Sequence, residues 1–246
     1  MIIIGYSERG AMNALFYGMA HANDEKAMNE FISLAGIEGA FSNFEIYSEF
    51  SLSDFGDPDM IVTAKDCNEN NVVFFIEAKA SCGMGYNLTK QQDFHDSYMQ
   101  NGEAHKDGHS SNLFYQLRLK NYFIQRLAEE TEDEKEEDPD EILDRLRKTR
   151  GHYRKIGKNI VVNKFKEILK KCKDHAYYIA IIPEQDEDKP TELLQAYGLH
   201  IHLITWEKVY ETDAFNKYVK PTIDFNQNKE NTVSQILNHP VQVKHN

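Results

Sequence analysis

The chain has 246 residues, enough for one large domain or two small ones with a hydrophobic core. Apolar residues make up 41% of the sequence, which excludes an intrinsically disordered chain although the net charge is −12. No apolar run is long enough to span a membrane, and the N-terminus lacks the charged flank of a signal peptide. The three cysteines form no CxxC pair, so we expect a cytoplasmic protein that does not contact membranes.

The first part of the chain predicts a helix followed by three strands. Ser7 is a suitable N-cap for a helix that runs to about Leu34, with an interruption near residues 21–24. Strand-like runs follow, and a polar, asparagine-rich stretch joins the last two as a hairpin. These runs cover residues 44–50, 60–64 and 72–76.

The rest of the chain predicts a long loop, three further helices and two strands, besides a short helix near residues 191–196. The loop covers residues 81–111 and is rich in Gly, Asn, His and Gln. The helices and strands are expected at residues 112–127, 138–151, 162–172, 177–182 and 200–205. The order predicts a single α/β domain over residues 1–246 with a mixed sheet, a charged helical insertion at about 129–173 and a polar tail at about 222–246.

Two neighbouring segments of opposite charge stand out. Residues 129–144 hold eleven acids and one base, whereas residues 145–173 hold twelve bases and one acid. Such blocks commonly solvate helix faces and neutralise each other in part. The alternative is a basic surface that follows a phosphate backbone, and charge alone does not decide between the two.

The strongest chemical signal lies at the ends of two adjacent strands. Asp59 precedes the run 60–64, and Glu77 and Lys79 follow the run 72–76 on one face. The hairpin can bring the two carboxylates together, where a divalent cation would offset their repulsion. Hard oxygen ligands from Asp59, Glu77 and the Ala78 carbonyl favour Mg²⁺ or Mn²⁺, with Lys79 as the electrostatic and proton-handling partner. The alternative is a hairpin end with ordinary solvated charges.

Pro58-Asp59 followed by Glu77-Ala78-Lys79 resembles the signature of the PD-(D/E)XK nuclease superfamily, and the expected αβββαβ order resembles the common core of that restriction-endonuclease-like fold. The resemblance implies a central mixed sheet flanked by helices and metal-dependent phosphodiester cleavage, usually of DNA. It implies that Asp59 and Glu77 bind the metal and that Lys79 is the catalytic lysine.

Three more residues are candidates for the same site. Asp57 lies two residues before Asp59 and is a substitute or second acid. Glu8 corresponds to an acid that many members contribute from the first helix, or else complements the helix dipole. Gln116 corresponds to a residue that faces the site from the helix after the hairpin. Lys120 stands four residues later where some exonuclease relatives have tyrosine, so the exonuclease subgroup is not supported.

The resulting expectation is a Mg²⁺- or Mn²⁺-dependent DNA endonuclease that contacts its substrate through the loop at 81–111 and the basic residues of 145–173. A homodimer would suit cleavage of both strands. One alternative is a non-catalytic nucleic-acid-binding or assembly protein that retains the fold. Another is an interaction protein whose opposed charge blocks dock a partner. No Gly-rich phosphate loop, GxSxG or HExxH pattern supports an NTPase, serine hydrolase or zinc protease.

Overall fold

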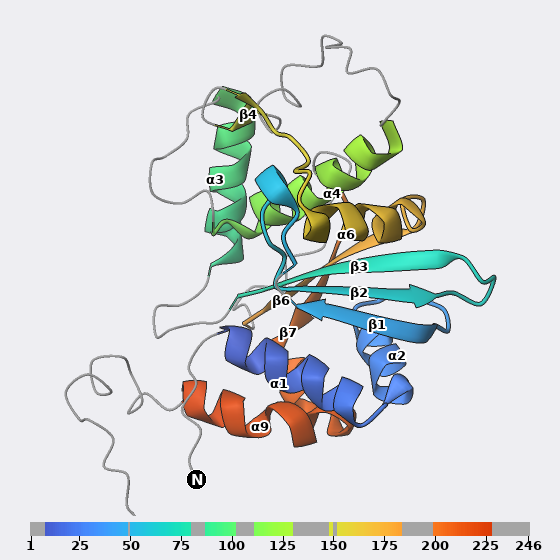
Figure 1. Cartoon of the computed structure of the whole chain (residues 1–246). Coiled ribbons are helices and arrows are strands. Elements are labelled where there is room, and N and C mark those ends of the chain that lie inside the picture. The colour runs from blue at the N-terminus through green and yellow to red at the C-terminus, as the bar shows by residue number, and fades with distance from the viewer. Residues whose placement is uncertain are drawn as a thin grey trace, which may run out of the picture.

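Figure 1 shows the protein as a computed structural model. The structure describes residues 8–48, 50–79, 87–101, 111–129, 148–149, 152–183 and 199–227. The predicted N-cap at Ser7 and the predicted helix near 191–196 lie outside these ranges.

The N-terminal part holds two helices and three strands. These are α1 (Glu8–His21), α2 (Glu25–Leu34), β1 (Ser42–Ser48), a 3₁₀ turn η1 (Ser53–Phe55), β2 (Met60–Lys65) and β3 (Asn71–Ala78). The rest of the described chain forms α3 (Leu88–Asn101), α4 (Leu113–Glu129), β4 (Lys148–Thr149), β5 (His152–Tyr153), α6 (Ile160–Lys170), β6 (Ala176–Ile182), β7 (Ile201–Thr205), α8 (Trp206–Glu211) and α9 (Asp213–Gln227).

A mixed sheet of five strands forms the centre, in the order β1-β2-β3-β6-β7. β1, β2 and β3 are antiparallel neighbours, whereas β6 pairs parallel with β3 and β7 pairs parallel with β6. Helices lie on both sides, with α1, α2 and α9 on one and α4 and α6 on the other (Figure 1). The predicted α/β class with a mixed sheet flanked by helices is therefore confirmed.

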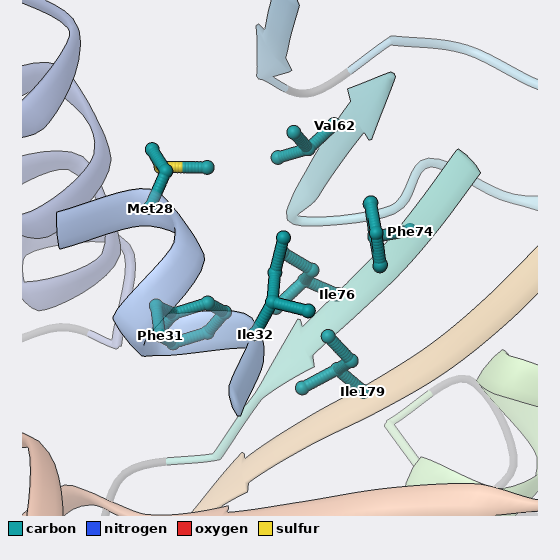
Figure 2. Close-up of a pocket in the computed structure, with 7 residues that line it drawn as sticks. All are labelled: Met28, Phe31, Ile32, Val62, Phe74, Ile76 and Ile179. Atoms are coloured by element: carbon teal, nitrogen blue, oxygen red, sulfur yellow. The ribbon is translucent and has the colours of Figure 1, made fainter. Parts of the chain in front are cut away.

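Side-chain alternation along the strands divides the core into two layers. Met60, Val62, Phe74 and Ile76 pack with α1, α2 and α9, whereas Ile61, Val73 and Phe75 pack with α4 and α6. Figure 2 shows the first layer at α2, where Met28, Phe31 and Ile32 face residues of β2, β3 and β6. The same alternation assigns Glu77, which follows Ile76, to the layer of α4.

A tight hairpin turn fixes the pairing of β2 with β3. The Asp66 carboxylate accepts hydrogen bonds from the backbone N–H groups of Asn68, at 2.9 Å, and Asn70, at 2.8 Å. Glu69 adopts a φ of 63°, which completes the turn. The resulting register pairs Met60 with Ile76 and Lys65 with Asn71.

The structure corrects three details of the sequence analysis. The segment 81–111 contains α3, whose buried positions Leu88, Gln92 and His95 are mostly polar, so apolar periodicity gave no signal. Lys148 and Thr149 pair with β5, so a helix does not continue to residue 151. α9 runs through Pro221 to Gln227, into the predicted polar tail.

The charged segment 129–173 ends in α6, which packs on the sheet. Val162, Phe165 and Leu169 of α6 are buried, and Phe165 contacts the rings of Tyr47 and Phe50. The predicted helix at 138–151 otherwise falls outside the described residues. Among the described helices, none combines the length and apolarity that crossing a membrane requires.

Candidate active site

The hairpin of β2 and β3 brings Asp59 and Glu77 together. The register pairs Met60 with Ile76, so its continuation by one residue sets Asp59 opposite Glu77. The Ala78 backbone N–H donates a hydrogen bond of 2.9 Å to Asp59 Oδ2, which fixes the Asp59 carboxylate against the end of β3. Two carboxylates from one hairpin thus lie at one end of the sheet.

Glu77 is buried beside a second buried charge, Lys120 of α4. Lys120 Nζ lies 3.1 Å from Glu77 Oε1, and both side chains are at most 2% exposed. The contact is an ion pair rather than an aligned hydrogen bond, and neither Glu77 oxygen accepts a hydrogen bond from a described residue. Buried carboxylate oxygens without donors are costly, and a proton or a cation relieves that cost.

The chain before Asp59 makes room for the Lys120 ammonium. Lys120 Nζ donates a long hydrogen bond of 3.5 Å to the Phe55 carbonyl. Gly56 follows with a φ of 79°, and a Cβ atom there would lie 3.3 Å from Lys120 Nζ. Glycine therefore permits both the left-handed backbone and the close approach of the lysine.

Lys79 extends β3 by one residue, and its backbone is held from two sides. Its N–H donates to the Ile181 carbonyl at 2.8 Å, and its carbonyl accepts from Trp206 Nε1 at 2.9 Å. The Lys79 residue is 9% exposed. Alternation assigns its side chain to the face of Glu77.

Four charges interact at this end of the sheet. Burial raises the pKa of Glu77 to about 7, Lys120 opposes that rise, Asp59 adds to it, and Lys79 lowers the pKa again. The formal charges of the two acids and the two lysines cancel. The cluster is thus charge-balanced by the chain alone.

The donor set suits a hard divalent cation. Carboxylate oxygens from Asp59 and Glu77 are ligands that Mg²⁺ and Mn²⁺ prefer, and the buried Glu77 oxygens have unused acceptor capacity. Within the described part of the chain, no three His, Cys, Asp or Glu side chains cluster as a metal site. A metal would therefore need a further ligand, such as the predicted Ala78 carbonyl or water.

The other predicted residues lie at different places. Asp57 is exposed in the turn before β2, whereas Asp59 is half-buried. Gln116 lies one helical turn before Lys120 on α4, and its buried Oε1 accepts no hydrogen bond from a described residue. Glu8 begins α1, which covers the opposite face of the sheet, and its side chain is outside the described set.

Lys120 is the functional candidate that the sequence analysis missed. In the sequence, Lys120 stands out only as a departure from an exonuclease pattern. A signal was present, because Gln116 and Lys120 are four residues apart and share a helix face. The same face carries Leu113 and Leu117, so Lys120 interrupts an apolar stripe directed at the sheet.

A basic surface lies in the same layer as Glu77. α6 buries Val162, Phe165 and Leu169. Several lysines on α6 and beside it are exposed, namely Lys155, Lys158, Lys164, Lys170, Lys171 and Lys173. The segment before α6 is tied to η1, because Arg154 donates to the Asp54 carbonyl and the Lys155 N–H donates to Asp54 Oδ2 at 2.9 Å. The start of the basic surface thus adjoins the turn that leads to Asp59.

Comparison with protein-family models, curated proteins and solved structures finds no match to this chain.

Proposed function

We propose that this chain is a Mg²⁺- or Mn²⁺-dependent phosphodiester hydrolase, a DNA endonuclease built on a restriction-endonuclease-like core. The observation behind this proposal is the convergence of Asp59, Glu77 and Lys79 at one end of the β2–β3 hairpin, where the oxygens of Glu77 are buried and only Oε1 contacts an ammonium group. Burying a carboxylate in this way lowers the stability of the fold, so a functional role is the expected reason for it. Buried carboxylates with a shifted pKa, such as Glu77, are typical of functional sites.

Asp59 and Glu77 would hold the metal ion, with the Ala78 carbonyl as the third protein ligand. When bound, a divalent cation supplies polarisation of a phosphodiester oxygen and a bound water of lowered pKa. The hydrogen bond from the Ala78 N–H orients the Asp59 carboxylate, so this ligand is prepared before the metal arrives.

Lys79 would act on the reacting phosphate itself. Its ammonium group can orient the attacking water or offset the negative charge that builds on the phosphate in the transition state. The hydrogen bonds from Lys79 N–H to Ile181 and from Trp206 to the Lys79 carbonyl fix the backbone at this position. The exposed lysines on α6 and beside it would contact the DNA backbone, since they lie in the same layer of the fold as Glu77.

Cleavage assays on supercoiled plasmid, single-stranded DNA and RNA, each with Mg²⁺, Mn²⁺ or EDTA, test this proposal. We expect metal-dependent cutting of DNA by the wild type and none by Asp59→Asn. Glu69→Gln is the matched control, because it also turns a carboxylate into an amide on the same hairpin, at the opposite end. Equal activity of wild type and Asp59→Asn would contradict the proposal.

A second candidate is a non-catalytic nucleic-acid-binding protein with the same fold. The Glu77–Lys120 ion pair favours it, because the chain itself supplies a cation to the buried carboxylate. Salt-dependent DNA binding by a folded wild type that cuts none of the substrates would support this candidate.

A further inference from the structure

The charge balance of the site has a consequence for metal binding. Lys120 is buried with Glu77, and its Nζ lies 3.1 Å from Glu77 Oε1. Together with Lys79 it gives the two carboxylates a full complement of positive charge. A divalent cation added to this neutral cluster would bring two uncompensated charges into a buried place. An anionic phosphodiester beside the metal would offset them.

We propose that Lys120 is a positioning residue that keeps the metal affinity of the free protein low, so that a divalent cation binds well only together with an anionic phosphodiester. This inference rests on the proposed function. Lys120 acts through Glu77: its ammonium holds the carboxylate in place in the metal-free protein and competes electrostatically with the incoming cation. The coupling is reciprocal, so the metal must strengthen DNA binding by the same factor as DNA strengthens metal binding.

The size of the effect follows from Coulomb's law. Two charges a few ångströms apart interact several times more strongly at the effective dielectric constant of a protein surface than in water. Removal of the Lys120 charge should therefore tighten metal binding by about tenfold or more. A divalent cation gains more from this change than a competing proton does, because it carries twice the charge.

Trp206 provides a direct reporter of the site. It is the one tryptophan of the chain, it is buried, and its Nε1 donates to the Lys79 carbonyl. Its fluorescence can follow Mn²⁺ titrations of the full chain without any measurement of activity. Calorimetric titration of Mn²⁺ gives an independent value of the same affinity.

The experiment compares wild type, Lys120→Met and Lys120→Arg at mildly alkaline pH. We expect Lys120→Met to bind Mn²⁺ about tenfold or more tightly than wild type, and Lys120→Arg to stay close to wild type. Lys65→Met is the matched control, because it removes the same charge from the other end of β2 and should leave the Mn²⁺ affinity unchanged. Asp59→Asn should abolish the tighter binding of Lys120→Met.

A second arm measures coupling in the wild type alone. A short phosphorothioate DNA duplex keeps the negative charge of the backbone and resists hydrolysis, whereas a methylphosphonate duplex is neutral. The charged duplex should tighten Mn²⁺ binding by about tenfold, and the neutral duplex should not. If circular dichroism shows that Lys120→Met does not fold, a wild-type Mn²⁺ affinity that the charged duplex leaves unchanged still overturns the inference.

Two results would overturn the inference: a folded Lys120→Met that binds Mn²⁺ no more tightly than wild type, or wild-type Mn²⁺ affinity that the charged duplex leaves unchanged. Either result together with metal-dependent cutting of DNA leaves the proposed function standing and removes only the role of Lys120. Tighter Mn²⁺ binding by Lys120→Met without cleavage of any substrate would instead leave the role of Lys120 and remove the nuclease.

Discussion

The buried pair of Glu77 and Lys120 predicts a sharply non-additive pair of mutations. Lys120→Met leaves a buried carboxylate without its counter-ion, and Glu77→Gln leaves a buried ammonium whose other described contact is a 3.5 Å hydrogen bond to Phe55. Breaking a buried ion pair on one side costs about 3–5 kcal/mol. The double variant leaves no charge uncompensated in the pair, so we expect it to cost about 1–2 kcal/mol, less than either single change.

Urea denaturation in EDTA measures the free energy of unfolding of wild type, the two single variants and the double variant in the metal-free protein. These four values form a double-mutant cycle. Each single variant should lower the free energy of unfolding by about 3 kcal/mol or more, and the interaction energy, the two single losses less the loss of the double variant, should be about 4 kcal/mol or more. The exposed pair Lys65–Glu69, at 3.6 Å, serves as the control cycle and should give less than about 1 kcal/mol. Additive losses at Glu77 and Lys120, so that the double variant is the least stable of the three, would refute the reasoning.

Three further predictions concern residues of α2 and its N-cap, and urea denaturation measures the change in stability for each. The backbone N–H of Ala27 and the ammonium of Lys217 lower the pKa of Asp24, so the advantage of wild type over Asp24→Asn should be full above the ordinary pKa of 3.8 and vanish as the pH falls through the lowered value. An advantage that persists in acid would contradict this assignment. Asn29 bonds both backbone groups of Phe41, at 2.7 and 2.8 Å, so Asn29→Ala should cost about 1–3 kcal/mol, and an unchanged midpoint would refute that role. Phe31 is fully buried, so Phe31→Ala should cost about 3–5 kcal/mol, and a loss below about 1 kcal/mol would mean the ring is not packed as described.

Much of the sheet could be predicted from the sequence because its strands are apolar and its turn is chemically distinctive. The predicted strands at 60–64 and 72–76 agree with the bounds of β2 and β3 to within a few residues at each end. The asparagine-rich stretch between them is the turn in which Asp66 caps the backbone. The strand at 44–50 was displaced by two residues at both ends, since β1 is an edge strand with a mixed burial pattern.

Helices with polar contacts were harder to predict. α3 buries Gln92 and His95 besides Leu88, so its sequence has the composition of a polar loop. α9 contains Pro221, which sequence reasoning takes as a helix end. Phe215 and Val219 pack in the core with residues of α1 and α2, and this packing stabilises the helix. Local helix propensity does not include such tertiary contacts.

The pairing of Asp59 with Glu77 followed from the hairpin, but the partner of Glu77 did not. Lys120 lies 43 residues further along the chain, and only the docking of α4 on the sheet brings its ammonium to the carboxylate. Lysine is rarely buried, so the expected place of a helical lysine is the solvent face. An ionisable residue on an otherwise apolar helix stripe is the signal that favours the other assignment.

The most direct test of the nuclease assignment separates metal binding from cleavage at Lys79. Wild type and Lys79→Met are purified in parallel, and each is assayed for Mn²⁺ binding and for nicking of supercoiled plasmid. We predict that Lys79→Met still binds Mn²⁺ but does not nick the plasmid, whereas wild type does both. Nicking at equal rates by the two proteins would contradict the assignment of the chemistry to this site.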